Sequence, residues 1–219
     1  VVAGNIDTVF ICMSLNQNFN LRRLERYLSV AYDGGAAPVV ILTKADLCRD
    51  VEDKTAQVQK AALGVDILAV SSLSGGWDGM MRYILPGQTV AFLGSSGVGK
   101  STLINQLTGT RSLATGEIGA GDKGRHTTTR RSLIRLASGA SVIDTPGMRE
   151  LGMWDSGDGI DAAFRDIDEL SRMCRFSDCT HTTEPGCAVQ KALAGGRLDA
   201  ARWSSFQKLK RENRSVSAR

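Results

Sequence analysis

The sequence lacks any apolar run near the roughly 20 residues that a membrane-spanning helix needs. Its start also lacks the basic stretch, apolar run and small-residue cleavage site of a secretory signal. These absences give no support to a membrane partner or to secretion, so we expect a cytoplasmic protein. Histidine is scarce, with two residues in 219. Internal repeats, low-complexity tracts and long heptad patterns are absent too, and we expect a monomer.

The length and composition suit one α/β domain of roughly 150 residues with a small appendage. Hydrophobic residues make up 42% of the chain, which is ordinary for a globular protein with a sizeable core. The chain has no initiator Met, and an apolar, strand-like run begins at Ile6. We therefore expect this sequence to be a piece of a longer protein, with an N-terminal domain missing.

Positive charge gathers towards the end of the chain. The net charge is only +4, yet seven Lys and Arg residues stand against two acidic residues from Arg197 onward. A basic segment of this kind is attracted to the phosphate backbones of nucleic acids. The alternative, which charge alone favours, is a solvated helix followed by a frayed end.

Three of the five cysteines lie within fourteen residues, as Cys174, Cys179 and Cys187, with His181 among them. Without a secretory signal, clustered Cys and His favour a metal over a disulfide. Three thiolates and one imidazole form a complete tetrahedral set for a structural Zn²⁺, with no open position. Such a small segment would depend on the metal to stay folded. The alternative is four unlinked core residues.

Strand-like apolar runs alternate with helical stripes, which predicts βαβ units and a largely parallel sheet. The expected strands cover residues 6–15, 39–42, 65–70, 88–93, 128–136 and 140–143. The expected helices between them cover residues 21–31, 50–63, 78–85 and 100–107. Beyond Asp144 the pattern becomes helical, with a glycine-rich joint at residues 152–159. We therefore divide the chain into residues 1–155 and 156–219.

A complete phosphate-binding motif, G-x-x-x-x-G-K-[ST], lies between an expected strand and an expected helix. It reads Gly94-Ser95-Ser96-Gly97-Val98-Gly99-Lys100-Ser101 and is followed by Thr102. The glycines let backbone N–H groups curl around a β-phosphate, and the helix adds its positive dipole end. We expect Lys100 to bridge the β- and γ-phosphates, Ser101 to ligate Mg²⁺, and Thr102 to join the nucleotide contacts. A chance glycine-rich turn is the disfavoured alternative.

The segment Thr43-Lys44-Ala45-Asp46 follows an apolar strand and matches the N/T-K-x-D element that reads guanine. The Asp46 carboxylate can accept hydrogen bonds from N1–H and the 2-amino group of guanine, which adenine does not offer. We expect the Lys44 stem to pack over the base. Ser71 and Ser72 follow the next strand, where a backbone N–H would reach guanine O6. GTP and GDP are therefore the expected ligands, and a P-loop ATPase is the disfavoured alternative.

The segment Asp144-Thr145-Pro146-Gly147 is a D-x-x-G switch element. We expect Asp144 to hold Mg²⁺ through a water and the Gly147 N–H to meet the γ-phosphate. Met148 follows, whereas many GTPases have a Gln there to orient the attacking water. A thioether cannot both donate and accept strong hydrogen bonds. The water therefore needs another positioning group, and we expect slow intrinsic turnover.

The segment Gly124-Arg125-His126-Thr127-Thr128-Thr129 lies between the phosphate loop and the switch element, where a Mg²⁺-ligating threonine is expected. Thr127 and Thr128 are both candidates, and the sequence leaves the choice open. His126 is a candidate catalytic group that positions the water. Alternatively, His126 packs within the switch or contacts a partner.

The order of these elements along the chain is inverted. In ordinary GTPases the phosphate loop comes first and the guanine-reading element last, whereas here Thr43 precedes Gly94 by 51 residues. The inversion indicates a circular permutation. The expected fold class is therefore a circularly permuted Ras-like α/β P-loop GTPase domain, with a mostly parallel sheet flanked by helices. A small, mainly helical zinc-binding domain is expected to follow it.

Taken together, these features resemble the circularly permuted bacterial GTPases of the RsgA (YjeQ/EngC) family. The resemblance covers nearly the whole chain. Besides the inverted order, it rests on the segment around His126, the D-x-x-G element followed by an apolar residue, and the Cys-x₄-Cys-x-His-x₅-Cys spacing. It implies an N-terminal OB-fold, expected to be missing here, then a GTPase domain and a helical zinc-binding domain. Thr43 departs from the usual pattern, in which an Asn contacts guanine N7.

The resemblance also implies a role in late maturation of the small ribosomal subunit. Family members bind the small (30S) subunit with its 16S rRNA, and the subunit stimulates their slow GTP hydrolysis. Hydrolysis is then coupled to a check or a release step, and His126 matches the residue proposed to help catalysis. A second class of function stays open, namely an RNA-binding assembly factor that uses guanine nucleotide only as a sensed ligand.

Overall fold

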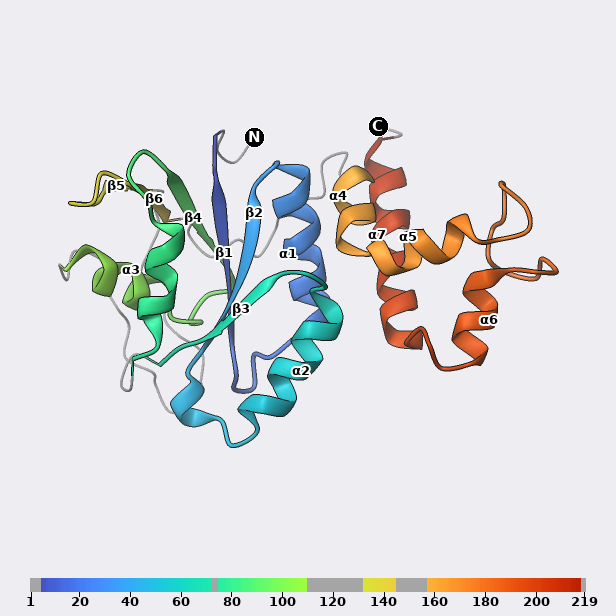
Figure 1. The fold of residues 1–219 in the computed structure, drawn as a ribbon, viewed down its shortest axis with the longest axis horizontal. Helices are drawn as coiled ribbons and strands as arrows, with labels where there is room; N and C mark the ends of the chain where they lie inside the picture. Colours follow the sequence, from blue (N-terminus) through green and yellow to red (C-terminus); the bar gives the residue numbers. More distant parts are fainter. Residues whose placement is uncertain (1–4, 72–74, 110–131, 145–156, 218–219) are drawn as a thin grey trace.

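The computed structural model describes residues 5–71, 75–109, 132–144 and 157–217. Within them, a six-stranded sheet has the strand order β3-β2-β1-β4-β6-β5 (Figure 1). Neighbouring strands are parallel, except that β5 runs antiparallel to β6. The strands are β1 (Thr8–Ser14), β2 (Ala37–Thr43), β3 (Asp66–Ala69), β4 (Thr89–Leu93), β5 (Ser132–Arg135) and β6 (Ser141–Asp144).

The central strands are buried on both faces, which explains their continuous apolar sequences. Every residue of β1 is buried, and so is each of the last five residues of β2. Along β1, Val9 and Ile11 contribute to one apolar cluster, whereas Phe10 and Cys12 contribute to another on the opposite face. Parallel strands between two helical layers show this pattern. The predicted α/β fold with a mostly parallel sheet is confirmed.

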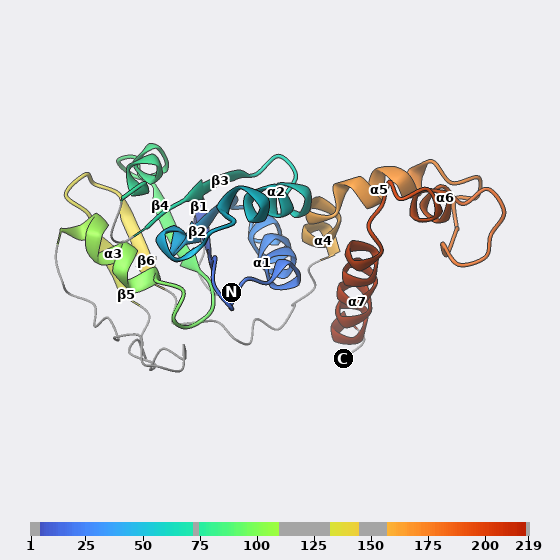
Figure 2. The same ribbon diagram turned by 90° about the horizontal axis from the view of Figure 1, so that it is seen from below.

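Helices cover both faces of the sheet (Figures 1 and 2). One face packs against α1 (Leu21–Asp33) and α2 (Val51–Ala61), the other against α3 (Lys100–Thr108) and the 3₁₀ helix η2 (Trp77–Tyr83). The short helix that the sequence predicts over residues 78–85 is this 3₁₀ helix, which begins after Gly76, whose φ is 86°. None of the described helices is long and apolar enough to cross a membrane.

Four helices follow the sheet in the described part of the chain. They are α4 (Gly157–Ala163), α5 (Arg165–Arg172), α6 (Ala188–Ala194) and α7 (Ala200–Ser217). Figure 1 shows them beside α1 and extending away from the sheet. Their apolar residues, among them Ile160, Val189 and Leu209, belong to the same buried cluster as Ile11 of β1 and Leu28 of α1. The predicted boundary between residues 155 and 156 lies outside the described residues.

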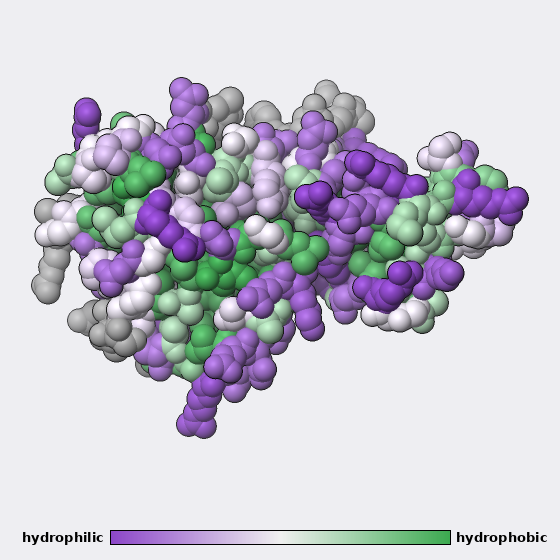
Figure 3. Space-filling view, viewed as in Figure 1, coloured by the Kyte–Doolittle hydropathy of each residue, from purple (hydrophilic) through white to green (hydrophobic). Residues whose placement is uncertain are grey.

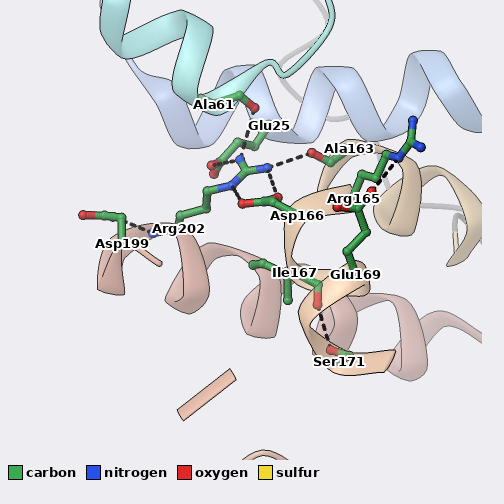
Figure 4. Close-up of polar contacts among 10 residues, drawn as sticks. All are labelled: Glu25, Ala61, Ala163, Arg165, Asp166, Ile167, Glu169, Ser171, Asp199 and Arg202. Atoms are coloured by element: carbon green, nitrogen blue, oxygen red, sulfur yellow. Dashed lines mark hydrogen bonds and ion pairs between the residues drawn. The ribbon is translucent and has the colours of Figure 1, made fainter. Parts of the chain in front are cut away.

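A buried arginine on α7 joins four other helices (Figure 4). The Arg202 guanidinium donates to the carboxylates of Glu25 on α1 and Asp166 on α5 at 2.7–3.1 Å. It also donates to the carbonyl oxygens of Ala61 on α2 and Ala163 on α4, at 3.1 and 3.0 Å. These bonds use all five N–H donors of the side chain. Arg202 therefore ties the C-terminal helices to the helices of the sheet.

The basic end of the chain is less available to a nucleic acid than its sequence indicates. Arg202 is buried, and Lys210 forms an ion pair with Asp161 at 2.6 Å. Lys208, Arg211 and Arg214 are exposed on α7. The charge pattern of the sequence did not reveal the contacts that Arg202 and Lys210 make within the protein.

Helix α4 packs so closely on α1 that Gly159 has no room for a side chain. A Cβ there would lie 2.2 Å from the carbonyl oxygen of Ser29 and 2.8 Å from the backbone nitrogen of Asp33. We expect Gly159→Ala to lower the free energy of unfolding by about 2–3 kcal/mol, because overpacking forces the helices apart. Urea denaturation followed by circular dichroism measures the change.

Gly157→Ala is the matched control for this prediction, because a Cβ at Gly157 would meet nothing closer than 3.7 Å. We expect it to be neutral, or to stabilise the helix by up to about 1 kcal/mol. Equal losses in the two variants would contradict the close packing of α4 on α1.

Candidate functional site

The predicted nucleotide-binding segments meet at one edge of the sheet. The phosphate loop follows β4, the Thr43–Asp46 segment spans the end of β2, Ser71 comes shortly after β3, and Asp144 ends β6. Carboxyl ends of parallel strands lie at the same edge of a sheet, which is where ligands of open α/β folds bind. Segments far apart in the sequence thus become neighbours.

The phosphate loop is a tight turn pressed against β1. Gly94 has a φ of 155°, and a Cβ there would lie 2.4 Å from the carbonyl oxygen of Cys12. Gly99, with a φ of 101°, directly precedes α3. Both positions require glycine, the first for the close approach and the second for its backbone conformation. Ser101 and Thr102 follow in the first turn of α3.

The ammonium group of Lys100 lies within the loop. It is buried and donates to the carbonyl oxygens of Gly94 and Ser95 at 2.7 and 3.0 Å. Burial lowers the pKa of Lys100 from its usual value, whereas the neighbouring Cys12 and Asp144 act in the opposite direction. Lys100 can exchange these carbonyl oxygens for phosphate oxygens by a rotation of its side chain.

Asp144 carries an unsatisfied oxygen next to this loop. The residue is 1% exposed, and its Oδ2 has no hydrogen-bond partner among the described residues. Burial raises the pKa of the Asp144 carboxyl, and the charge of Lys100 opposes this rise. Buried polar atoms are normally hydrogen-bonded. A lone carboxylate oxygen near the hydroxyl-bearing first turn of α3 therefore fits a hydrated Mg²⁺, whose ligands are oxygens.

The Thr43–Asp46 segment is held by the residues that follow the neighbouring strand β3. The Ser71 hydroxyl donates to Asp46 Oδ1 at 2.5 Å, and the Ala45 N–H donates to the Val70 carbonyl at 3.2 Å. Asp46 is exposed and lies in a short 3₁₀ helix, η1 (Ala45–Leu47), which follows Lys44 in a left-handed conformation with φ 59°. The carboxylate is thus oriented at one oxygen and open to a ligand.

Two contacts to the phosphate loop were not predicted. The Thr43 hydroxyl donates to the Val98 carbonyl at 2.5 Å, so it braces the loop from the position where Asn is usual. Arg23 on α1 donates from Nη1 to the Ser95 hydroxyl at 3.1 Å. The motif around Thr43 was a signal in the sequence from which the contact of Thr43 with the loop could have been predicted. For Arg23 the sequence carried no such signal, because a basic residue on a helix usually faces solvent.

Several predicted site residues lie outside the described residues, and their roles stay predictions. They are Ser72, His126, Thr127, Thr128 and Gly147. The other predicted nucleotide and magnesium residues are described, and they lie at the sheet edge on the segments given above.

Cys174, Cys179, His181 and Cys187 converge between α5 and α6, with their ligand atoms within 4.8 Å of one another. His181 Nδ1 lies 3.5 Å from the Sγ atoms of Cys174 and Cys187, which are 3.9 Å apart. A tetrahedral Zn²⁺ with ordinary bond lengths would separate S from N by about 3.6 Å and S from S by about 3.8 Å. The four residues fit a zinc ion, and none of the three cysteines forms a disulfide.

Backbone groups and α7 support this cluster. The N–H groups of Ala188 and Gln190 donate to the Sγ atoms of Cys174 and Cys187 at 3.3 and 3.4 Å. Burial raises the pKa of the Cys174 thiol, but hydrogen bonds from backbone N–H groups and from the neighbouring cysteines outweigh it, so the pKa lies below its usual value. Burial and the neighbouring cysteines raise the pKa of Cys179 to about 11. The ring of His181 meets Trp203 of α7 edge-on at 5.9 Å. These contacts hold the cluster residues in place.

A phosphate loop that joins a central strand of a mostly parallel sheet to a helix defines a P-loop nucleotide-binding protein. The model of the RsgA GTPase family matches residues 1–154, and the chain belongs to this family. It is 55% identical over 214 residues to small ribosomal subunit biogenesis GTPase RsgA 2 of Lactiplantibacillus plantarum. The protein of the same name from Vibrio parahaemolyticus is 50% identical over 218 residues. Each match covers 97% of this chain, which spans 60% of the length of either relative.

Two solved structures resemble the whole described fold. YjeQ from Thermotoga maritima superposes with a TM-score of 0.70 at 26% identity, covering 98% of this chain and 73% of YjeQ. YloQ, described as a circularly permuted GTPase, gives a TM-score of 0.67 at 27% identity, covering 96% of this chain and 69% of YloQ. The predicted family and the permuted fold are therefore confirmed.

Removal of the metal should loosen the C-terminal helices. We expect a chelator, or His181→Ala, to release zinc and to lower the unfolding midpoint by roughly 4–8 °C, the shift that about 2 kcal/mol causes in a chain of this size. Zinc content and near-ultraviolet circular dichroism, to which Trp203 contributes with the other aromatic residues, check this. Thr183→Ala alters an exposed residue of the same loop and should keep the metal. An unchanged midpoint after complete metal loss would contradict a structural zinc site.

Proposed function

We propose that the chain hydrolyses GTP to GDP and phosphate during late maturation of the small ribosomal subunit. The observation that carries the proposal is that three groups suited to a nucleotide and a cation lie together at one edge of the sheet. These are a loop for phosphates, an oriented carboxylate for guanine at Asp46, and a buried carboxylate for a cation at Asp144. Family membership and the names of the relatives support it.

The loop and Lys100 bind the phosphates in this proposal. Backbone N–H groups of residues 94–100 surround the β-phosphate, and Lys100 leaves the carbonyls of Gly94 and Ser95 to contact the β- and γ-phosphates. Because the lysine is buried, its charge acts at close range on the oxygens that become more negative as the γ-phosphoryl group transfers. The loop stays in place meanwhile, since Thr43 holds the Val98 carbonyl.

Magnesium completes the site. Ser101, Asp144 through a water, and either Thr127 or Thr128 would hold Mg²⁺, which when bound neutralises charge on the phosphate oxygens. The Gly147 N–H donates to the γ-phosphate. His126, or a group supplied by the ribosome, orients the attacking water, since Met148 cannot. Intrinsic turnover is slow for that reason, and a partner accelerates it.

Base selection rests on Asp46 and the Ser71–Ser72 segment. Asp46 accepts the two guanine donors, and a backbone N–H near Ser72 donates to O6. An adenine nucleotide would leave the carboxylate without these donors. Sites of this kind therefore reject adenine nucleotides strongly. Lys44 packs its stem over the base.

The partner in this proposal is the small (30S) ribosomal subunit with its 16S rRNA, met by a monomer in the cytoplasm. Residues 1–155 act as the GTPase domain, and residues 156–219 form a helical domain held by one structural Zn²⁺. Figure 3 shows hydrophilic side chains interspersed with hydrophobic ones over the C-terminal helices. The exposed Lys208, Arg211 and Arg214 add positive charge suited to phosphate backbones.

The same exposed charge favours a second candidate, an RNA-binding assembly factor that only senses guanine nucleotide. Lys100→Ala separates the two functions, because it removes a group needed for phosphoryl transfer and lies far from α7 in sequence. Loss of hydrolysis together with loss of function in cells supports the GTPase. Retained function without hydrolysis supports the sensor.

GTP turnover, measured with and without purified small ribosomal subunits at one salt concentration, tests the proposed function. We expect slow turnover of the chain alone and clear stimulation by the subunit. If stimulation is absent, the same assay on a longer chain that includes the N-terminal part of the relatives decides whether docking needs that part. Fast turnover without any RNA would contradict the role assigned to a partner.

Asp46→Asn should change the base preference of the site. The amide offers one acceptor and one donor, which match N1–H and O2 of xanthine but not the two donors of guanine. We expect GDP affinity to fall by at least about 100-fold and xanthosine diphosphate affinity to rise. Fluorescent-nucleotide titration measures both. Asp53→Asn, in an exposed position of α2, is the control, and an equal loss for both bases in Asp46→Asn would contradict base reading.

A further inference from the structure

The first two turns of α1 contact the phosphate loop. Arg23 Nη1 donates to Ser95 Oγ at 3.1 Å, and this bond joins residues 72 positions apart. The Arg23 backbone N–H is itself held by the side chain of Asn20 at 2.9 Å. Such a cap fixes the start of a helix. The guanidinium that restrains the loop is thus anchored to a well-defined helix end.

The same turns of α1 are bound to α7 on another side. Arg22 Nη1 donates to the Ala201 carbonyl at 2.9 Å. One turn further on, Arg26 forms an ion pair with Glu212 at 2.7 Å, with about a third of each side chain exposed. These contacts join the beginning and the middle of α7 to the residues on either side of Arg23.

Between them lies the buried pair of Glu25 and Arg202, 3.1 Å apart, with side chains 5% and 9% exposed. Figure 4 shows the guanidinium enclosed by its partners. Parting α7 from α1 would break this buried ion pair and expose apolar residues of the cluster that both helices share, such as Leu28 and Leu209, which is unfavourable. We therefore expect the first turns of α1 to follow α7 when it is displaced.

We propose that Arg23 is a positioning residue for the phosphate loop, and that through α1 it couples this loop to the helices α4–α7. Displacement of α7 moves the turn that carries Glu25, and Arg23 on the same turn transmits the movement to Ser95. The inference rests on the proposed GTP hydrolysis. Through this coupling, a partner that contacts the C-terminal helices can change the rate of that reaction.

Loss of Arg23 leaves the loop N–H groups less well ordered around the transferring phosphoryl group. We expect Arg23→Ala to lower kcat about tenfold, with KM changed by less than about threefold, because misplaced groups lose transition-state contacts. Arg23→Lys keeps one donor and should recover part of kcat. Ser95→Ala, which removes the acceptor, should match Arg23→Ala.

A double-mutant cycle tests the coupling. We expect Arg202→Met to slow turnover at least about threefold when Arg23 is present and to add nothing in the Arg23→Ala background. Arg26→Ala breaks a pair that is about one third exposed and serves where Arg202→Met fails to fold, with a smaller effect of the same kind. Arg165→Ala is the matched control, because its ion pair with Glu169 is confined to the surface of α5. Additive effects in the cycle would overturn the proposal.

A second test does not depend on catalysis. It measures the rate of backbone amide hydrogen exchange of residues 94–99 in the nucleotide-free chain. We expect faster exchange in Arg23→Ala and in Arg26→Ala, with no further increase when both are combined. This pattern in a chain that does not hydrolyse GTP would contradict only the proposed function. Unaltered exchange in a chain that does hydrolyse GTP would contradict the coupling.

Discussion

The parallel pairing of β2, β1, β4 and β6 is the constraint on which the site depends. It places every carboxyl end at one edge, so the phosphate loop, the Thr43–Asp46 segment and Asp144 meet whatever their order in the chain. The connections between strands can differ without moving these ends. A permuted order of motifs therefore still brings these segments together at the same edge.

Hydrogen bonds between neighbouring segments then set the finer geometry. Thr43 holds the Val98 carbonyl, and Ser71 holds Asp46, each bond joining the segments that follow two different strands. Such bonds contribute only about 1 kcal/mol each to stability. Their larger effect is on position, because they fix the Thr43–Asp46 segment and the phosphate loop relative to each other and to the strands beside them.

Chemistry encoded by short spacings was predictable from the sequence, whereas contacts between distant segments were not. The phosphate loop and the zinc cluster are defined by residue types within fourteen positions, and the parallel sheet followed from the alternation of apolar runs. Arg202 was placed with the exposed basic end, because nothing local marks an arginine whose partner Glu25 is 177 residues away. Arg23 was missed for the same reason. The roles of His126, Thr127 and Thr128 stay predictions.

The continuous apolar cluster has a thermodynamic consequence. Because Ile11 and Leu28 share it with Ile160 and Leu209, the described chain offers no plane along which sheet and C-terminal helices could part without exposing core. Heat should therefore unfold the sheet and the C-terminal helices in a coupled transition, because neither can open without exposing core of the other. A ligand that binds only the native state raises the melting temperature of everything in that transition. Nucleotide at one end of the molecule thus protects the thiols at the other from thermal exposure.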